Sequence, residues 1–198
     1  MYALICGLIA SLIFTAAPTF AADVRQFDIQ SLRLGMSVDE IKEAGKKAGL
    51  GEFREVRSPS FEQSVAMKQQ RSIRPTDFAG TQTLRVKLPN ASIQISLVPT
   101  QQGSKAWRIV YSWLDTALSR ETLREEVFRR YGQPDRQIDR EWLWGDTATF
   151  FDARTKPYLE FRLDPASAGV EKPLGILTLA DPSMQRASRE AIDSQARK

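Results

Sequence analysis

Hydrophobic and polar residues alternate in the middle of the chain, which is the period of a β-strand with one buried face. The alternation begins at Thr83, turns back at Pro89-Asn90 and appears a third time after a polar loop. The apolar positions of the three runs are Leu84, Val86 and Leu88, then Ile93, Ile95 and Leu97, then Trp107, Ile109, Tyr111 and Trp113. We therefore expect a three-stranded antiparallel meander that packs through one face.

Two helices are predicted with well-marked ends. Ser37 followed by Glu40 is a capping-box pattern at the first start, and glycines 49 and 51 mark the stop. The second helix begins at Ser119 and ends at Gly132. The pattern also predicts a short helix at residues 62–70 and a short strand or extended lead-in at residues 27–34.

The order of elements then repeats. Four short β-like runs follow the second helix, at residues 142–144, 148–151, 158–163 and 175–179, and a last helix opens at Asp181-Pro182 and continues to about Ala191. The sequence thus predicts the α+β class, with helices packed on antiparallel meander sheets. A tandem duplication of a helix-plus-meander unit explains the order, and a single irregular α+β domain is the alternative. The expected divisions are 1–21 (leader), 22–117 and 118–181 (two α+β units), and 182–198 (exposed helix and tail).

The first 22 residues contain no charged side chain, whereas all 28 Lys and Arg and all 24 Asp and Glu lie at Asp23 or later. An apolar run at residues 4–14, then Pro18 and small residues, is typical of a signal peptide cleaved after Ala21. The alternative is an uncleaved anchor, because the segment approaches the roughly 20 residues of a membrane-spanning helix. We expect cleavage, a periplasmic protein, and membrane contact only transiently through the leader.

The chain has no histidine, and its single cysteine, Cys6, lies in the predicted leader. The mature protein would then lack disulfides, a cysteine nucleophile, the commonest general base and the commonest transition-metal ligand. We therefore expect no cofactor and no metal, and a non-enzymatic role is favoured. The formal net charge of +4 favours anionic surfaces, whereas no aromatic-basic motif indicates nucleic acid as a partner.

Residues 34–41, Leu-Gly-Met-Ser-Val-Asp-Glu-Ile, resemble the signature that opens small outer-membrane assembly lipoproteins of the BamE/SmpA type. The Gly132-Gln133-Pro134 turn is similar to the Gly-x-Pro turn that follows helices in those proteins, although here it ends the second predicted helix. The mature chain has no counterpart of their lipidated cysteine. The related β-lactamase-inhibitor-like fold is a tandem of such units. The resemblance implies this fold and binding of other proteins through a sheet face.

The segment Glu141-Trp142-Leu143-Trp144 contains the candidate binding residues. In a strand the two tryptophans share one face and Leu143 takes the other. If Leu143 faces the core, Trp142 and Trp144 form an exposed platform suited to glycans or a protein partner. The alternative is that both tryptophans are core residues facing a helix, with Leu143 on a covered rear face.

Four carboxylates lie close together in the same part of the sequence: Asp139, Glu141, Asp146 and Asp152. Two carboxylates at a suitable separation would hydrolyse a glycosidic bond. An envelope glycan hydrolase or glycan-binding protein is therefore the alternative function. The function that the sequence favours is a periplasmic, non-enzymatic module that binds an envelope protein or an anionic envelope component.

Overall fold

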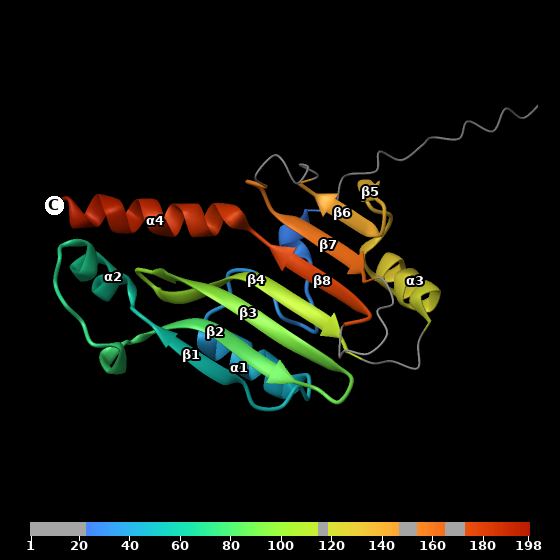
Figure 1. The fold of residues 1–198 in the computed structure, drawn as a ribbon, viewed down its shortest axis with the longest axis horizontal. Helices are drawn as coiled ribbons and strands as arrows, with labels where there is room; N and C mark the ends of the chain where they lie inside the picture. Colours follow the sequence, from blue (N-terminus) through green and yellow to red (C-terminus); the bar gives the residue numbers. More distant parts are fainter. Residues whose placement is uncertain (1–22, 115–118, 147–153, 165–172) are drawn as a thin grey trace, which may run out of the picture.

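One antiparallel sheet dominates the computed structural model, which describes residues 23–114, 119–146, 154–164 and 173–198 (Figure 1). Its described strands are β1 (Arg54–Ser58), β2 (Gly80–Lys87), β3 (Ala91–Thr100), β4 (Gly103–Trp113), β5 (Arg136–Ile138), β6 (Glu141–Gly145), β7 (Tyr158–Leu163) and β8 (Gly175–Ala180). Their order, β1-β2-β3-β4-β8-β7-β6-β5, is that of two meanders joined through their last strands. The predicted α+β class is confirmed.

The helices occupy two places on this sheet. Helices α1 (Val38–Lys47) and α3 (Arg120–Tyr131) cover one face, whereas α2 (Phe61–Lys68) and α4 (Pro182–Ala196) pack on each other beside the β3–β4 hairpin (Figure 1). Lys68 on α2 pairs with Asp193 on α4 at 2.8 Å, and Ser188 Oγ donates to the Pro99 carbonyl at 2.6 Å. Two 3-10 helices, Val24–Gln26 and Pro75–Asp77, complete the described helical segments.

The core is built from side chains that stand directly opposite one another across the strands. One row contains Leu84, Ile95, Ile109, Leu179, Leu159 and Trp144, and the next contains Val86, Ile93, Tyr111, Leu177, Phe161 and Trp142. Ile41 of α1 and Leu123 and Val127 of α3 are buried against these rows. A single core therefore runs through both meanders.

Most predicted elements are present in the described residues. Helices α1 and α3 begin after Ser37 and Ser119, and the capping box between Ser37 and Glu40 is formed. The three-stranded meander is confirmed, and the short helix begins at Phe61, one residue before the predicted start. Strands β1 and β5 were not predicted, and α4 extends to Ala196 rather than Ala191. The predicted leader and the run at 148–151 lie outside the described residues.

Strands β1–β4 lie within the first predicted unit and β5–β8 within the second, and the proposed boundary at residues 117 and 118 lies outside the described residues. Each half places a helix before four consecutive antiparallel strands, although α2 interrupts the first half between β1 and β2. The duplication itself stays a prediction.

Residues 27–34 form neither the short strand nor the continuous extended lead-in that the alternation predicted. This segment turns back on itself at Gln30 and Ser31, which both have positive φ, and it forms only the isolated bridge between Ile29 and Leu32. The Asp28 carboxylate accepts the Ser31 backbone N–H at 2.9 Å, which favours this turn over an extended strand. Ile29 and Leu32 are buried, so the alternation reflected a packed turn rather than a sheet strand.

The turn is held against the C-terminal end of α3. Arg130 pairs with the Asp28 carboxylate at 2.7 Å, and the Tyr131 hydroxyl donates to the Asp28 carbonyl at 2.7 Å. The Phe27 ring meets the Tyr131 ring edge-on, with centroids 5.3 Å apart. Burial raises the pKa of Tyr131 to about 12, because the phenolate would lose its hydration.

Trp107 does not stand in line with Ile109 as the alternation predicted. Ser96 pairs with Arg108 and Leu97 pairs with Ala106, so Trp107 is the extra residue of a β-bulge. Ala106 bonds to Gly35 and Met36, whereas β4 pairs with β8 from Arg108 onward. The bulge therefore marks the point where β4 changes its neighbour, and Ala106 takes the buried position.

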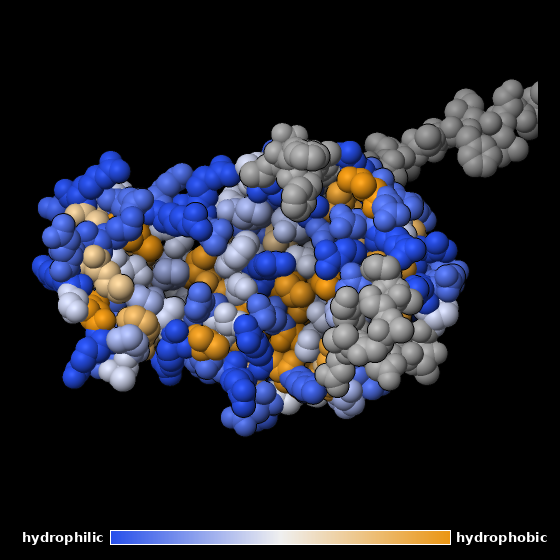
Figure 2. Space-filling model, viewed as in Figure 1, coloured by the Kyte–Doolittle hydropathy of each residue, from blue (hydrophilic) through white to orange (hydrophobic). Residues whose placement is uncertain are grey.

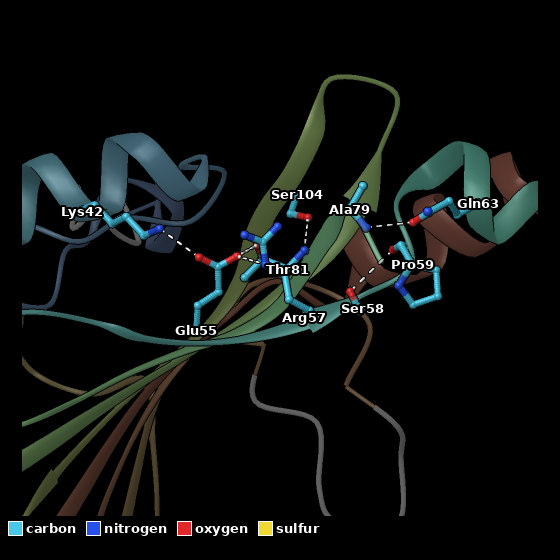
Figure 3. A network of polar contacts seen from close by, with 9 residues as sticks. All are labelled: Lys42, Glu55, Arg57, Ser58, Pro59, Gln63, Ala79, Thr81 and Ser104. Carbon is cyan, nitrogen blue, oxygen red and sulfur yellow. Dashed lines mark hydrogen bonds and ion pairs between the residues drawn. The ribbon is translucent and has the colours of Figure 1, made fainter. Parts of the chain in front are cut away.

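A polar network ties α1 to the edge of the sheet (Figure 3). The Glu55 carboxylate of β1 accepts from Lys42 Nζ of α1 at 2.9 Å and from Thr81 Oγ1 of β2 at 2.6 Å, and it lies 3.2 Å from Arg57 Nε. The Glu55 side chain is 18% exposed. The hydrogen bonds from Lys42 and Thr81 lower the pKa of Glu55 below its usual value.

We expect Glu55→Gln to lower the free energy of unfolding by about 1–2 kcal/mol at neutral pH, because it removes a charge-assisted contact at a mostly covered site. Since the folded pKa of Glu55 is lowered, its contribution is present above the unfolded value and is lost as the pH falls through the folded value. Urea unfolding between pH 7 and pH 3 should therefore show a shallower acid loss in Glu55→Gln than in the wild type. Glu43→Gln, at the exposed Glu43–Lys47 pair, is the control and should change little. Equal acid losses in wild type and Glu55→Gln would contradict the role of the network.

Candidate binding surface

The sheet face opposite α1 and α3, here called the open face, carries mostly exposed or half-buried side chains over β1–β4, whereas Leu143 of β6 and Thr178 and Ala180 of β8 are buried on the same face. Figure 1 looks onto this face, with α1 behind the strands, and Figure 2 shows it as mostly hydrophilic with hydrophobic groups over the middle of the sheet. Its central row runs Arg54, Arg85, Gln94, Val110, Thr178 and Glu160. The rows on either side are Lys87, Ser92, Ser112, Ile176 and Arg162, and Thr83, Ser96, Arg108, Ala180 and Tyr158.

The first half of this face carries positive charge that no described carboxylate compensates. Four cations lie there, which we call the basic cluster: Arg54, Arg85, Lys87 and Arg108. None of them forms a salt bridge with a carboxylate of the described residues, and no Asp or Glu stands on the open face of β1, β2, β3 or β4. Arg54, Arg85 and Lys87 are exposed. The cluster is therefore an accessible cationic surface.

The positions within the basic cluster are close enough to repel one another. Arg54 stands directly opposite Arg85, on neighbouring strands that lie about 4.8 Å apart. Arg85 and Lys87 are two residues apart on one strand, which is about 7 Å. Like charges directly opposite each other destabilise a sheet, so an anion that lies over this surface would relieve the repulsion. The half-buried Arg108 adds a buried Nε that has no hydrogen-bond partner among the described residues.

The second half of the open face differs, because its charges are paired. Arg154 pairs with Glu160 of β7, and its guanidinium lies over the Tyr158 ring at 4.4 Å from the centroid. Arg162 lies 3.6 Å from Asp164. Within the part of the chain that the structure describes, the uncompensated charge of the open face is thus confined to β1–β4.

The structure places the predicted binding residues in the core rather than on the open face. Trp142 and Trp144 are only 5% and 3% exposed. The Phe128 ring of α3 meets both indoles edge-on, at 5.8 and 6.0 Å between centroids, and Phe161 stacks on Trp142 at 5.4 Å. Leu143 is fully buried on the opposite side. Both tryptophans are therefore core residues that face a helix, which is the alternative given above for this segment, and they do not form an exposed aromatic platform.

We expect Trp142→Ala to lower the free energy of unfolding by about 3–5 kcal/mol, because it leaves a large cavity between α3 and β7. Trp107→Ala is the control, since this half-buried indole lies at the bulge, and it should be less destabilising. Chemical denaturation followed by circular dichroism measures both. If Trp142→Ala is as stable as the wild type, the indole does not support the core.

Of the carboxylates considered for glycan hydrolysis, Glu141 and Asp146 lie at opposite ends of β6. Asp139 is exposed in the turn before β6, and Asp146 follows the strand, where it accepts the backbone N–H groups of Thr155 and Lys156 at 2.9 Å each. Glu141 and Asp146 are five residues apart along an extended strand, about 17 Å, whereas glycosidase carboxyl groups lie about 5–10 Å apart. Asp152 lies outside the described residues. The described geometry thus gives this alternative no carboxylate pair that spans β6.

Sequence reasoning missed the basic cluster. The sequence pattern does indicate that three of its members point away from the core, because Arg85, Lys87 and Arg108 alternate with buried apolar residues. Arg54 belongs to a strand without a recognised signal. The decisive information, that these cations stand on neighbouring strands of one face, comes from the strand register.

Comparison with known proteins returned no match to a family model, to a curated protein or to a solved structure. The resemblance to the BamE/SmpA type therefore stays a prediction. Among the helices of the described residues, none combines the length and the apolar character that crossing a bilayer requires.

Proposed function

We propose that this protein is an exported, non-enzymatic binding module of the cell envelope that docks an envelope partner on its open face. The observation that supports the proposal is the basic cluster, an accessible group of uncompensated cations on the strands of a sheet whose other face is filled by the core. A partner with complementary charge would gain attraction at this surface and would be steered toward it.

The placement of the cluster on regular strands also favours binding. The strand backbones are held by ladder hydrogen bonds on both sides in β2, β3 and β4. Side chains presented by such a framework need little backbone ordering when a partner arrives, which lowers the entropic cost of association. The open face is therefore suited to recognition without a conformational change of the sheet.

The cellular compartment in this proposal comes from the uncharged first 22 residues. If these residues act as a cleaved signal peptide, protein recovered from the periplasm of its native host begins at Ala22. Intact-mass measurement of the periplasmic and cytosolic fractions tests this. If the protein is instead found in the cytosol with its first 21 residues still attached, the proposed location in the cell envelope is wrong.

The docking surface is tested with two matched double variants of the whole chain. The cluster variant combines Arg85→Glu with Lys87→Glu, both exposed on the open face. The helix variant combines Lys46→Glu with Arg129→Glu, exposed cations on α1 and α3 on the other side of the sheet. Both double variants change the net charge of the protein by the same amount. A difference between them therefore reports on the position of the charges and not on the total charge.

We expect crosslinking in envelope fractions of the host to capture the same partner with the wild type and the helix variant, and at least about tenfold less of it with the cluster variant. Circular dichroism should show equal folding of all three proteins. Equal capture by the cluster variant, or equal loss in both variants, would contradict docking through the open face.

A further inference from the structure

We infer that the partner presents an acidic protein segment, which lies across the open face of β1–β4 and carries Asp or Glu side chains to the basic cluster. This inference rests on the proposed function and names the chemistry of its partner. The first argument is charge complementarity. Arg54, Arg85, Lys87 and Arg108 have no carboxylate counterpart among the described residues, and carboxylates of a partner would supply one.

The second argument is the spacing of the cations, which are spread over several strands instead of converging on one point. Arg85 and Lys87 lie about 7 Å apart along β2, and Arg108 lies on β4, two strands away or about 10 Å across the sheet. Residues two apart in an extended peptide are separated by the same distance of about 7 Å. An extended segment with acidic residues at alternate positions therefore matches Arg85 and Lys87 in spacing as well as in charge.

The third argument is the surface beside the cluster, which has the composition of a protein interface. Half-buried Val110 and Ile176 lie at the middle of the sheet, next to the hydroxyl and amide groups of Ser92, Gln94 and Ser112. Arginine-rich surfaces with a partly apolar centre are typical of protein contacts. Hydroxyl and amide side chains have both donors and acceptors for the backbone of a bound peptide.

A lipid surface fits these features less well. Interfacial membrane binding needs apolar side chains that insert together beside the cations. The large apolar side chains that are exposed among the described residues are Val56, Met67 and Ile138, and they lie on β1, α2 and β5. Val56 stands on the open face beside Arg54, but Ile138 lies at the opposite edge of the sheet and Met67 lies on α2, so they form no continuous apolar surface beside the basic cluster. We therefore assign the cluster to an acidic protein segment rather than to an anionic headgroup.

The experiment uses the whole expressed chain and three fluorescent eight-residue peptides that alternate serine with glutamate, glutamine or lysine. Fluorescence anisotropy at low salt should show the wild type binding the glutamate peptide at least about tenfold more tightly than the glutamine peptide. The cluster variant should lose about tenfold or more of this affinity, whereas the helix variant should stay within about twofold of the wild type. Raising the salt to about 0.5 M should weaken the binding, because the screening length falls from about 10 Å at 0.1 M toward 3 Å at 1 M.

The outcomes separate this inference from the proposed function. No preference for the glutamate peptide, or an equal loss in both variants, would overturn the acidic segment. Co-sedimentation with vesicles of phosphatidylglycerol and phosphatidylcholine that is lost in the cluster variant would assign the surface to lipid and also overturn it. If envelope capture depends on the cluster while the glutamate peptide does not bind, docking on the open face stands and only the acidic segment fails.

Discussion

The pairing of β4 with β8 is the interaction on which the rest of the structure depends. It joins the last strand of each meander over six residue pairs, from Arg108 opposite Ala180 to Trp113 opposite Gly175. Because β4 pairs with β8, the apolar rows of the first meander continue into those of the second, and α1 and α3 cover one continuous core. The β4–β8 pairing also joins the rows of the first meander to those of the second on the opposite side of the sheet. The open face therefore extends over both meanders.

The size of the helices explains why the large aromatic side chains of the sheet are buried. Both α1 and α3 are short, with 10 and 12 residues, and α1 buries only Ile41 and Gly45. The space between sheet and helices in the second half is filled instead by Trp142, Trp144 and Phe161, and the Phe128 ring of α3 packs edge-on against both indoles. Aromatic rings bury a large apolar area each, so a few of them complete a core that short helices cannot fill. On the open face of β1–β4 the exposed side chains are mainly polar and cationic, so the recognition proposed for it relies on charge.

The predictable elements were those whose signals lie within a few residues. The capping box of Ser37 and Glu40 and the alternation around Pro89-Asn90 depend on neighbouring side chains, and both are formed. The failures depended on distant contacts. Residues 27–34 alternate like a strand but form a turn that packs against the C-terminal end of α3. Trp107 lies in a bulge because β4 hydrogen-bonds to Gly35 and Met36 before this residue and pairs with β8 after it. Strand β1, with little apolar alternation, exists because β2 pairs with it.

The sequence by itself determined the α+β class, the start of each main helix and which side chains of a strand point the same way, because periodicity and capping are local physical effects. Only the tertiary structure decided which of the two sides is buried and which strands are neighbours. As a result, Trp142 and Trp144 are buried in the core, and the four cations of the basic cluster, Arg54, Arg85, Lys87 and Arg108, lie together on one accessible face. The reason is that burial and register are set by contacts between residues far apart in the chain, which no local pattern contains.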